Sequence, residues 1–350
     1  MSKRMKEKER KEKKGLKVFG IIVLILIILL VTLIGGIFLF INNKLNKMQL
    51  IDIDKGELGI SEKADEGLAE YRNIAIFAVD SRDNNLERGN RSDGIIIASI
   101  NNTTKDVNLI SVYRDSYVEI EGYGLDKINH AYSYGSAPLA IKTLNNNLDL
   151  NIKEFVTVNF DAVAEAVNEL GGVEINIERD ELNYINDYIS GTSNNTGITS
   201  NRITNTGIQT LDGVQAVAYA RIRYTEGGDL ERAERMRDVI EAMVNKLKTK
   251  SIGEINRFVD KILPKVYTNI RASEIFSLMP NMMSYNISNS IGWPYDTRGI
   301  TLDRWYGVPV TLESNVTRLH KEVFGNEEYV ISDEIKLISD KIVSRTGYSK

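Results

Sequence analysis

The sequence contains no cysteine and only two histidines in 350 residues. The first absence excludes disulfides, a thiol nucleophile and a cysteine-ligated zinc site. His130 and His320 are far apart in the sequence, so His130 is expected to be a structural or pocket-rim residue rather than a metal ligand. A P-loop and a Gly-x-Ser-x-Gly motif are also lacking, which disfavours P-loop nucleotide hydrolases and serine hydrolases with a nucleophile elbow.

Charged residues are absent from residues 18–41, and residues 1–17 carry nine lysines and arginines against three glutamates. A helix over the uncharged run is about 36 Å long, enough to cross a bilayer, and the basic flank should stay in the cytoplasm. No small-residue cleavage site follows, which favours an uncleaved anchor over a signal peptide. We therefore expect a single-pass cell-membrane protein with a basic cytoplasmic tail (1–17), a transmembrane helix (18–41), a spacer (42–70) and one extracellular domain (71–350).

Excess positive charge is lacking in the rest of the chain. Residues 48–350 carry 33 basic and 45 acidic residues, a net charge of −12. Such a balance excludes general nucleic-acid binding, which depends on neutralising phosphates with excess cationic charge. Any cluster of arginines in this part is therefore a local positive island, suited to one small anionic ligand.

Apolar and β-branched runs at residues 73–79, 94–100 and 107–112 predict strands. The apolar stripe of residues 229–250 predicts a helix, and the Asn-, Ser-, Thr- and Gly-rich residues 183–207 predict a mobile loop or lid. Strands that alternate with helices indicate an α/β fold, here a three-layer α/β/α domain with a central mixed sheet.

Arginines and aspartates recur together, several of them directly after predicted strands, where ligands gather in open α/β sheets. The planar guanidinium suits bidentate phosphate binding, and carboxylates beside it can hold Mg²⁺ together with the phosphates of a substrate. The sequence therefore predicts a site for a pyrophosphate and a metal. The five clusters are Asp80-Ser81-Arg82, Arg91-Ser92-Asp93, Arg114-Asp115, Arg221-Ile222-Arg223, and Asp229 with Arg232 and Arg235.

Two of these clusters go against ordinary local preferences. In an extended segment Arg221 and Arg223 would share one face, which is unfavourable unless an anion lies between them. Arg232 and Arg235 stand near a helix N-terminus, where the dipole disfavours cations and a bound phosphate would compensate. Each cluster alone has a structural explanation, for example Asp229 as an N-cap.

The order of these motifs resembles the LytR-CpsA-Psr (LCP) family, over about residues 72–250. The resemblance implies an extracytoplasmic α/β/α enzyme that transfers a glycopolymer, such as wall teichoic acid or capsular polysaccharide, from a polyprenyl-pyrophosphate lipid to peptidoglycan, with Mg²⁺ as cofactor. Besides the five clusters, it rests on Lys127-Ile128-Asn129, Gly171-Gly172-Val173 and Leu211-Asp212-Gly213.

The resemblance also implies roles for single residues. Asp80 and Asp93 correspond to metal-associated carboxylates, Lys127 to a pocket residue, and Asn129 adds an amide beside it. We expect the catalytic set to be Asp80, Asp93, Arg114, Arg221 and Arg223. The residues that correspond to a pyrophosphate clamp are Arg82, Arg91, Arg114, Arg221, Arg223, Arg232 and Arg235.

Three positions depart from the pattern of the family. Ala78 replaces a glycine, Tyr113 a proline, and Met236 a glutamine, whose loss removes a polar contact near the phosphates. Met236, Ile240 and Met243 are candidates to line an apolar tunnel for the lipid, with plain core packing as the alternative.

The expected reaction is attack of a peptidoglycan hydroxyl on the phosphorus nearest the polymer sugar, with polyprenyl phosphate leaving and Asp93 or Asp80 assisting deprotonation. Two alternatives remain open at this point. One is a pyrophosphatase acting on the same lipid, with water as the acceptor. The other is a membrane-anchored sensor or regulator without enzymatic activity.

Overall fold

The structure is a computed structural model that describes residues 49–81, 86–87, 89–271, 274–275 and 283–349. The predicted basic tail, the predicted transmembrane helix and Arg82 lie outside these residues. Among the helices in the described ranges, none is both long and apolar enough to span a membrane.

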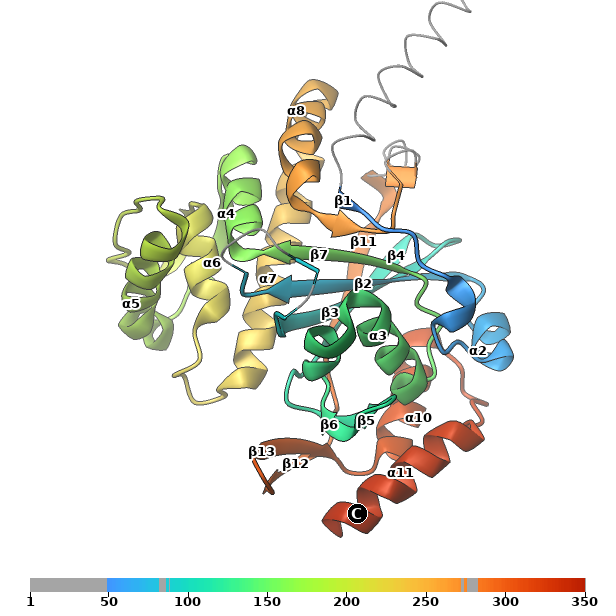
Figure 1. Cartoon of the computed structure of the whole chain (residues 1–350). Coiled ribbons are helices and arrows are strands. Elements are labelled where there is room, and N and C mark those ends of the chain that lie inside the picture. The colour runs from blue at the N-terminus through green and yellow to red at the C-terminus, as the bar shows by residue number, and fades with distance from the viewer. Residues whose placement is uncertain (1–48, 82–85, 88, 272–273, 276–282, 350) are drawn as a thin grey trace, which may run out of the picture. The chain divides into compact units, whose positions relative to one another are not determined.

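The centre of the fold is a mixed sheet of seven strands, in the order β1-β10-β7-β2-β3-β4-β11 (Figure 1). β2 pairs in parallel with β7 and antiparallel with β3, while β4 pairs antiparallel with β3 and in parallel with β11. The predicted α/β fold with a central mixed sheet is confirmed. Its strands are β1 (Gln49–Leu50), β2 (Tyr71–Val79), β3 (Ser92–Asn101), β4 (Asp106–Val112), β7 (Glu154–Asn159), β10 (Tyr267–Thr268) and β11 (Asn286–Trp293).

Helices cover both faces of this sheet. Both faces carry apolar side chains, since alternate residues in a strand point to opposite faces. In β3, Ile95 and Ile97 belong to one buried cluster, and Ile96 and Ala98 belong to the other. The first face is covered by α3 (His130–Leu148), α10 (Leu312–Phe324) and α11 (Asp333–Thr346). The second is covered by α4 (Phe160–Glu169), α6 (Gly213–Arg221), α7 (Asp229–Lys248) and α8 (Ile252–Ile262).

Three two-stranded sheets lie outside the central one. Two of them pack near the end of β4, where Ser116 bridges to Gly307. These two sheets pair β5 (Tyr117–Ile120) with β6 (Gly124–Lys127) and β12 (Thr297–Thr301) with β13 (Trp305–Pro309). The third pairs β8 (Val173–Ile177) with β9 (Gly207–Leu211).

The loop predicted at residues 183–207 is wrong over its first half, because α5 (Arg179–Thr196) is a helix there. A capping box between Glu178 and Glu181 begins it, and Gly197 ends it in the left-handed conformation. Ile185 and Ile189 are buried one turn apart, which anchors the helix against α6. Most of the Asn, Ser and Thr residues that suggested a loop lie on its solvent side or in its last turn, whereas Thr192 is buried.

The spacer predicted at residues 42–70 also differs from the structure over its described part. Leu58 and Leu68 are buried in the core, on either side of the short helix α2 (Glu62–Gly67). The compact unit is Met48–Lys350, so the boundary predicted at residue 71 lies inside it. Ile51, Ile53 and Ile60 also pack against this core, so the segment is held by apolar residues whose spacing follows no regular period.

Candidate functional site

The predicted clusters meet where β2 and β4 end and β3 begins. Because β3 runs antiparallel to both neighbours, Asp80, Asp93 and Arg114 come to the same edge of the sheet. Arg114 Nη1 lies 2.6 Å from Asp93 Oδ1. Asp80 is exposed and directly follows Val79, which pairs with Ser92, so Asp80 and Asp93 lie close together along the backbone at this end of the strand pair.

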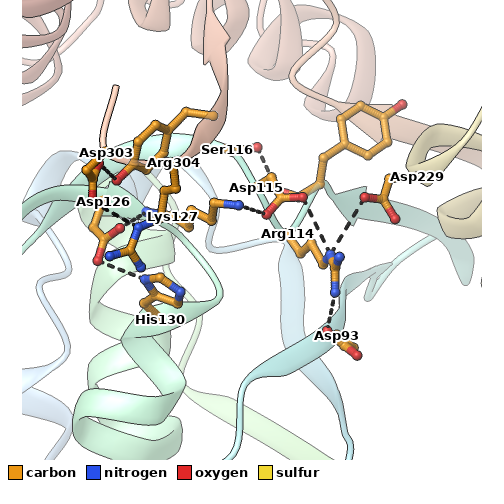
Figure 2. Close-up of polar contacts among 12 residues, drawn as sticks. Asp93, Arg114, Asp115, Ser116, Asp126, Lys127, His130, Asp229, Asp303 and Arg304 are labelled. Carbon is orange, nitrogen blue, oxygen red and sulfur yellow. Dashed lines mark hydrogen bonds and ion pairs between the residues drawn. The ribbon is translucent and has the colours of Figure 1, made fainter. Parts of the chain in front are cut away.

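The first turn of α7 brings Asp229 and Arg232 to this edge. Arg232 Nη1 lies 3.2 Å and Arg223 Nε 3.0 Å from Asp229 Oδ1, while Arg114 Nε lies 3.7 Å from Asp229 Oδ2. Arg232 Nη2 also donates to the main-chain oxygen of Asp93 at 3.1 Å. Figure 2 shows Arg114 between Asp93 and Asp229. We refer to Arg114, Arg223 and Arg232 as the clamp.

The pKa values of Asp229, Arg114 and Arg232 are set by burial and by the neighbouring charges, and all three groups stay ionised at neutral pH. Burial alone would raise the pKa of Asp229, but Arg232, Arg114 and Arg223 together bring that pKa below its usual value. Burial opposes the charge of Arg114, yet the carboxylates of Asp93, Asp229 and Asp115 raise its pKa. Burial lowers the pKa of Arg232 to about 10, which still leaves it charged at neutral pH.

Two donors of the clamp are unused among the described residues. Arg114 Nε and Arg232 Nε are buried and make no hydrogen bond, although Arg114 Nε lies within ion-pair distance of Asp115 and Asp229. A buried donor without an acceptor is costly, by about 1–3 kcal/mol. An oxyanion that accepts hydrogen bonds from these donors would remove that cost.

Asp229 is the carboxylate that holds the three guanidinium groups together, so its replacement should destabilise the protein. We expect Asp229→Asn to lower the free energy of unfolding by about 3 kcal/mol at pH 7, since it leaves like charges side by side without their carboxylate.

The stabilisation by Asp229 should also depend on pH. The folded pKa of Asp229 lies below the usual 3.8, so the stabilisation is complete above pH 3.8 and is lost as the pH falls through the folded pKa. Denaturant unfolding of the full chain between pH 7 and pH 3 measures this. Asp333→Asn, at a fully exposed carboxylate, is the control, and equal stabilities of the two variants at pH 7 would contradict the assignment.

A second set of polar groups continues from the clamp. Lys127 Nζ donates to Asp115 Oδ1 at 2.7 Å, and Asp115 Oδ2 lies 3.5 Å from Arg114 Nε. His130 Nδ1 lies 2.8 Å from Asp126 Oδ2, a structural contact of the kind expected for this histidine (Figure 2). Asn129 is buried, and its main-chain N–H donates to the oxygen of Arg114. Asp115 belongs to the predicted Arg114-Asp115 cluster, but no role of its own was predicted for it.

Other predicted residues take different positions. Arg91 is exposed at the start of β3. The extended segment expected at Arg221 and Arg223 is wrong, because Arg221 is the last residue of α6. Its Nη1 donates to Thr192 Oγ1 at 3.1 Å, and its guanidinium lies 4.9 Å from the centre of the Phe160 ring. Arg221 and Arg223 therefore diverge.

Arg235 faces away from the clamp. Its Nε lies 2.7 Å from Glu181 Oε1 and its Nη2 2.7 Å from Glu231 Oε2, and it also donates to the main-chain oxygen of Ile222 and to Thr225. Arg235 is 4 % exposed, and its carboxylate partners raise its pKa in spite of burial. In this structure it ties α7 to α5.

An apolar cavity of about 280 Å³ adjoins the clamp. It lies between the sheet and the helices of the second face, and Met236, Ile240 and Met243 line it, as the tunnel hypothesis expected. Met236, Gly94 and Ile96 also line the small cleft formed by Asp93, Arg114, Asp229 and Arg232. The same three residues thus separate a charged compartment from an apolar one.

A sequence model described as the LytR_cpsA_psr family matches residues 38–295. The chain belongs to this family. The resemblance seen in the motifs is thereby confirmed, and the match extends beyond residue 250 to include β11.

Members of the LytR-CpsA-Psr family with similar sequences have names that describe a transferase. Polyisoprenyl-teichoic acid–peptidoglycan teichoic acid transferase TagT of Bacillus subtilis is 29% identical over 274 residues, which cover 76% of this chain and 82% of that protein. The transferase TagU of Halalkalibacterium halodurans is 31% identical over 255 residues, which cover 70% of this chain and 77% of that protein.

Solved structures of the LytR-CpsA-Psr family share the fold. "TagT bound to LIIa-WTA" superposes with a TM-score of 0.60 at 24% identity, covering 74% of this chain and 92% of the other. The family protein YwtF (TagT) with bound octaprenyl pyrophosphate lipid gives a TM-score of 0.55 at 20% identity, over 85% of this chain and 99% of the other.

Proposed function

We propose that this protein transfers a teichoic acid or a related anionic glycopolymer from a polyprenyl-pyrophosphate lipid to peptidoglycan. The observation that carries the proposal is the shared wall of Gly94, Ile96 and Met236 between the clamp and the apolar cavity. A ligand whose apolar chain fills the cavity and whose head lies against the clamp must have an anionic group joined directly to that chain. A prenyl pyrophosphate has this constitution, and the names of the relatives agree with it.

In the proposed reaction the acceptor hydroxyl oxygen bonds to the phosphorus that carries the polymer sugar. The bond from that phosphorus to the bridging oxygen breaks, and polyprenyl phosphate leaves with the electron pair. Such a transfer depends on positioning and on stabilisation of charge, which Arg114, Arg223 and Arg232 supply from fixed positions. Asp229, whose pKa is lowered, stays ionised and is a positioning residue. Asp93 and Asp80 remain the candidates to accept the proton of the hydroxyl.

Mg²⁺ fits this arrangement as the proposed cofactor. The described part of the chain has no cluster of three or more histidine, cysteine or carboxylate side chains that would hold a metal alone. Mg²⁺ is commonly bound by one or two carboxylates together with phosphate oxygens, and Asp80 and Asp93 both lie at this end of the β2–β3 pair. Asp93, Asp115 and Asp229 already offset most of the charge of the clamp and Lys127. When bound, Mg²⁺ would supply the positive charge that a diphosphate still requires.

The membrane anchor belongs to the same proposal. Residues 18–41 would hold the protein in the bilayer with the domain outside, where its lipid-linked donor is confined. This topology predicts that protease added to intact cells digests the domain and leaves a short basic fragment.

Transfer is tested by incubating the full chain in detergent with a labelled polyprenyl-pyrophosphoryl glycan, Mg²⁺ and peptidoglycan. We expect label covalently bound to peptidoglycan, and less of it when the metal is chelated. Release of free glycan phosphate would instead indicate a pyrophosphatase, and unchanged lipid would indicate a sensor. Either of these results would overturn the proposal.

The cavity is tested by filling it. We expect Ile240→Trp to weaken binding of a polyprenyl pyrophosphate by tenfold or more, because the indole occupies space needed by the chain, an effect of about 1.4 kcal/mol or more. Binding of inorganic pyrophosphate should change less than about twofold, since the clamp is untouched. Ile252→Trp, at a side chain that is 79% exposed, is the matched control. Equal losses for both ligands would show that Ile240→Trp disturbs the fold rather than a lipid site.

A further inference from the structure

The two tryptophans of the chain have opposite surroundings. Trp293 is completely buried, whereas Trp305, the first residue of β13, is 51% exposed. A single exposed apolar side chain is ordinary, so the case for Trp305 depends on how its indole is held and on what lies beside it.

A pair of glycines holds the indole in place. Gly299 of β12 and Gly307 of β13 are direct partners in the hairpin, and Trp305 lies on the same face of it two residues before Gly307. A Cβ atom added at Gly299 would come within 2.8 Å of Trp305 Nε1, and one at Gly307 within 3.6 Å of the indole. The indole therefore lies across the two glycines. On the other face of the hairpin, Tyr306 and Val308 are buried in the core, which fixes its position.

This hairpin adjoins the clamp. The main-chain N–H of Gly307 donates to the main-chain oxygen of Asp115 at 2.9 Å, and the side chain of Asp115 lies beside that of Arg114. Figure 2 shows Asp303 and Arg304, from the turn of the same hairpin, on one side of Asp115, with Arg114 and Asp229 on the other.

The hairpin and the lipid cavity lie on opposite sides of the clamp. The sheet residues that line the cavity come from β7, β2 and β3, whereas Asp115 follows β4, and β12 follows β11 at the far edge of the sheet. In an in-line phosphoryl transfer the attacking and leaving oxygens stand on opposite sides of the phosphorus. A lipid that leaves toward the cavity therefore requires an acceptor that approaches from the side of the hairpin.

We propose that Trp305, supported by Gly299 and Gly307, is the binding platform for the acceptor, a saccharide ring of a peptidoglycan strand. The C–H face of a pyranose would stack on the exposed indole, an apolar surface of suitable size. Thr297 and Thr301 lie on the same face and are exposed, so their hydroxyls can bond those of the sugar. This inference rests on the proposed transfer, because the direction of approach follows from that reaction.

The first test measures steady-state transfer by the full chain with Trp305→Ala. We expect the KM for a soluble N-acetylglucosamine–N-acetylmuramic acid oligosaccharide to rise about tenfold, while the KM for the lipid donor stays within about twofold. Trp305→Phe keeps an aromatic face and should restore most of the affinity for the acceptor. Leu337→Ala, at another exposed apolar residue (57%), is the control and should change neither constant.

The second test does not depend on catalysis. Because Trp293 is buried, acrylamide should quench the fluorescence of Trp305 selectively, and the oligosaccharide should protect it. Protection by the oligosaccharide but not by inorganic pyrophosphate supports the platform, even if the wild type were to transfer nothing and the proposed function failed. A rise in donor KM with unchanged acceptor KM, or no change in either constant together with no protection, would overturn the inference.

Discussion

Replacing Arg114 by alanine should lower kcat/KM for glycan transfer by about 10²- to 10³-fold, the usual cost of removing one preorganised donor from a charge-stabilising site. Arg114 lies between Asp93 and Asp229 at the centre of the clamp, and its buried Nε makes no hydrogen bond, so it can donate to a bound phosphate. The fold should survive, since Asp115 keeps Lys127 and Asp229 keeps Arg223 and Arg232 as partners. Steady-state kinetics together with thermal unfolding separates the two effects.

Two further variants sharpen this test. Arg114→Lys keeps the charge but loses the planar fork, and should recover only part of the rate. Arg318→Ala removes an arginine that pairs with Glu322 on the outside of α10, and should leave transfer unchanged. Arg221→Ala should also reduce turnover if the predicted catalytic set is right. Wild-type activity of Arg114→Ala would refute the clamp, and wild-type activity of Arg221→Ala would remove Arg221 from the predicted catalytic set.

Arg235→Ala should have its largest effect on stability, although Arg235 belongs to the same sequence pattern as Arg232. The variant leaves Glu181, which is 6% exposed, as a buried charge without its guanidinium. We expect a loss of about 3–5 kcal/mol in the free energy of unfolding, measured by denaturant titration of the full chain.

A double variant distinguishes this explanation from simple loss of packing. Arg235→Met combined with Glu181→Met removes both charges and retains volume, so it should recover most of the stability lost in Arg235→Met alone. If the double variant is as unstable as the sum of the two single variants, the two side chains are not coupled as the structure indicates.

The convergence of Asp93, Arg114, Asp229 and Arg232 was predictable, because strand ends and helix N-termini are where α/β sheets present ligand-binding residues. The different orientation of Arg235 was not. Three residues along a helix fall about 60° short of a full turn, so Arg232 and Arg235 share a side only approximately. Which of them faces the sheet edge depends on Glu181 in α5, a helix that the sequence did not predict.

Helix α5 illustrates why part of the site escaped prediction. Its buried residues Ile185 and Ile189 are separated by polar residues, and its last turn is rich in Ser, Asn and Thr, which favour loops when considered locally. Packing against α6 overrides that preference. The position of Trp305 was equally hidden, since it depends on the pairing of Gly299 with Gly307 and on the contact of that hairpin with Asp115.

The central claim is that one prenyl pyrophosphate occupies the clamp and the apolar cavity together. Its most direct test is photo-crosslinking of the full chain with a polyprenyl pyrophosphate that carries a diazirine on its isoprene chain, followed by peptide mapping. We predict labels at Ile240, Met243 and Val156, and their loss when unlabelled polyprenyl pyrophosphate competes. Labels confined to α10 and α11, on the opposite face of the sheet, would contradict the account.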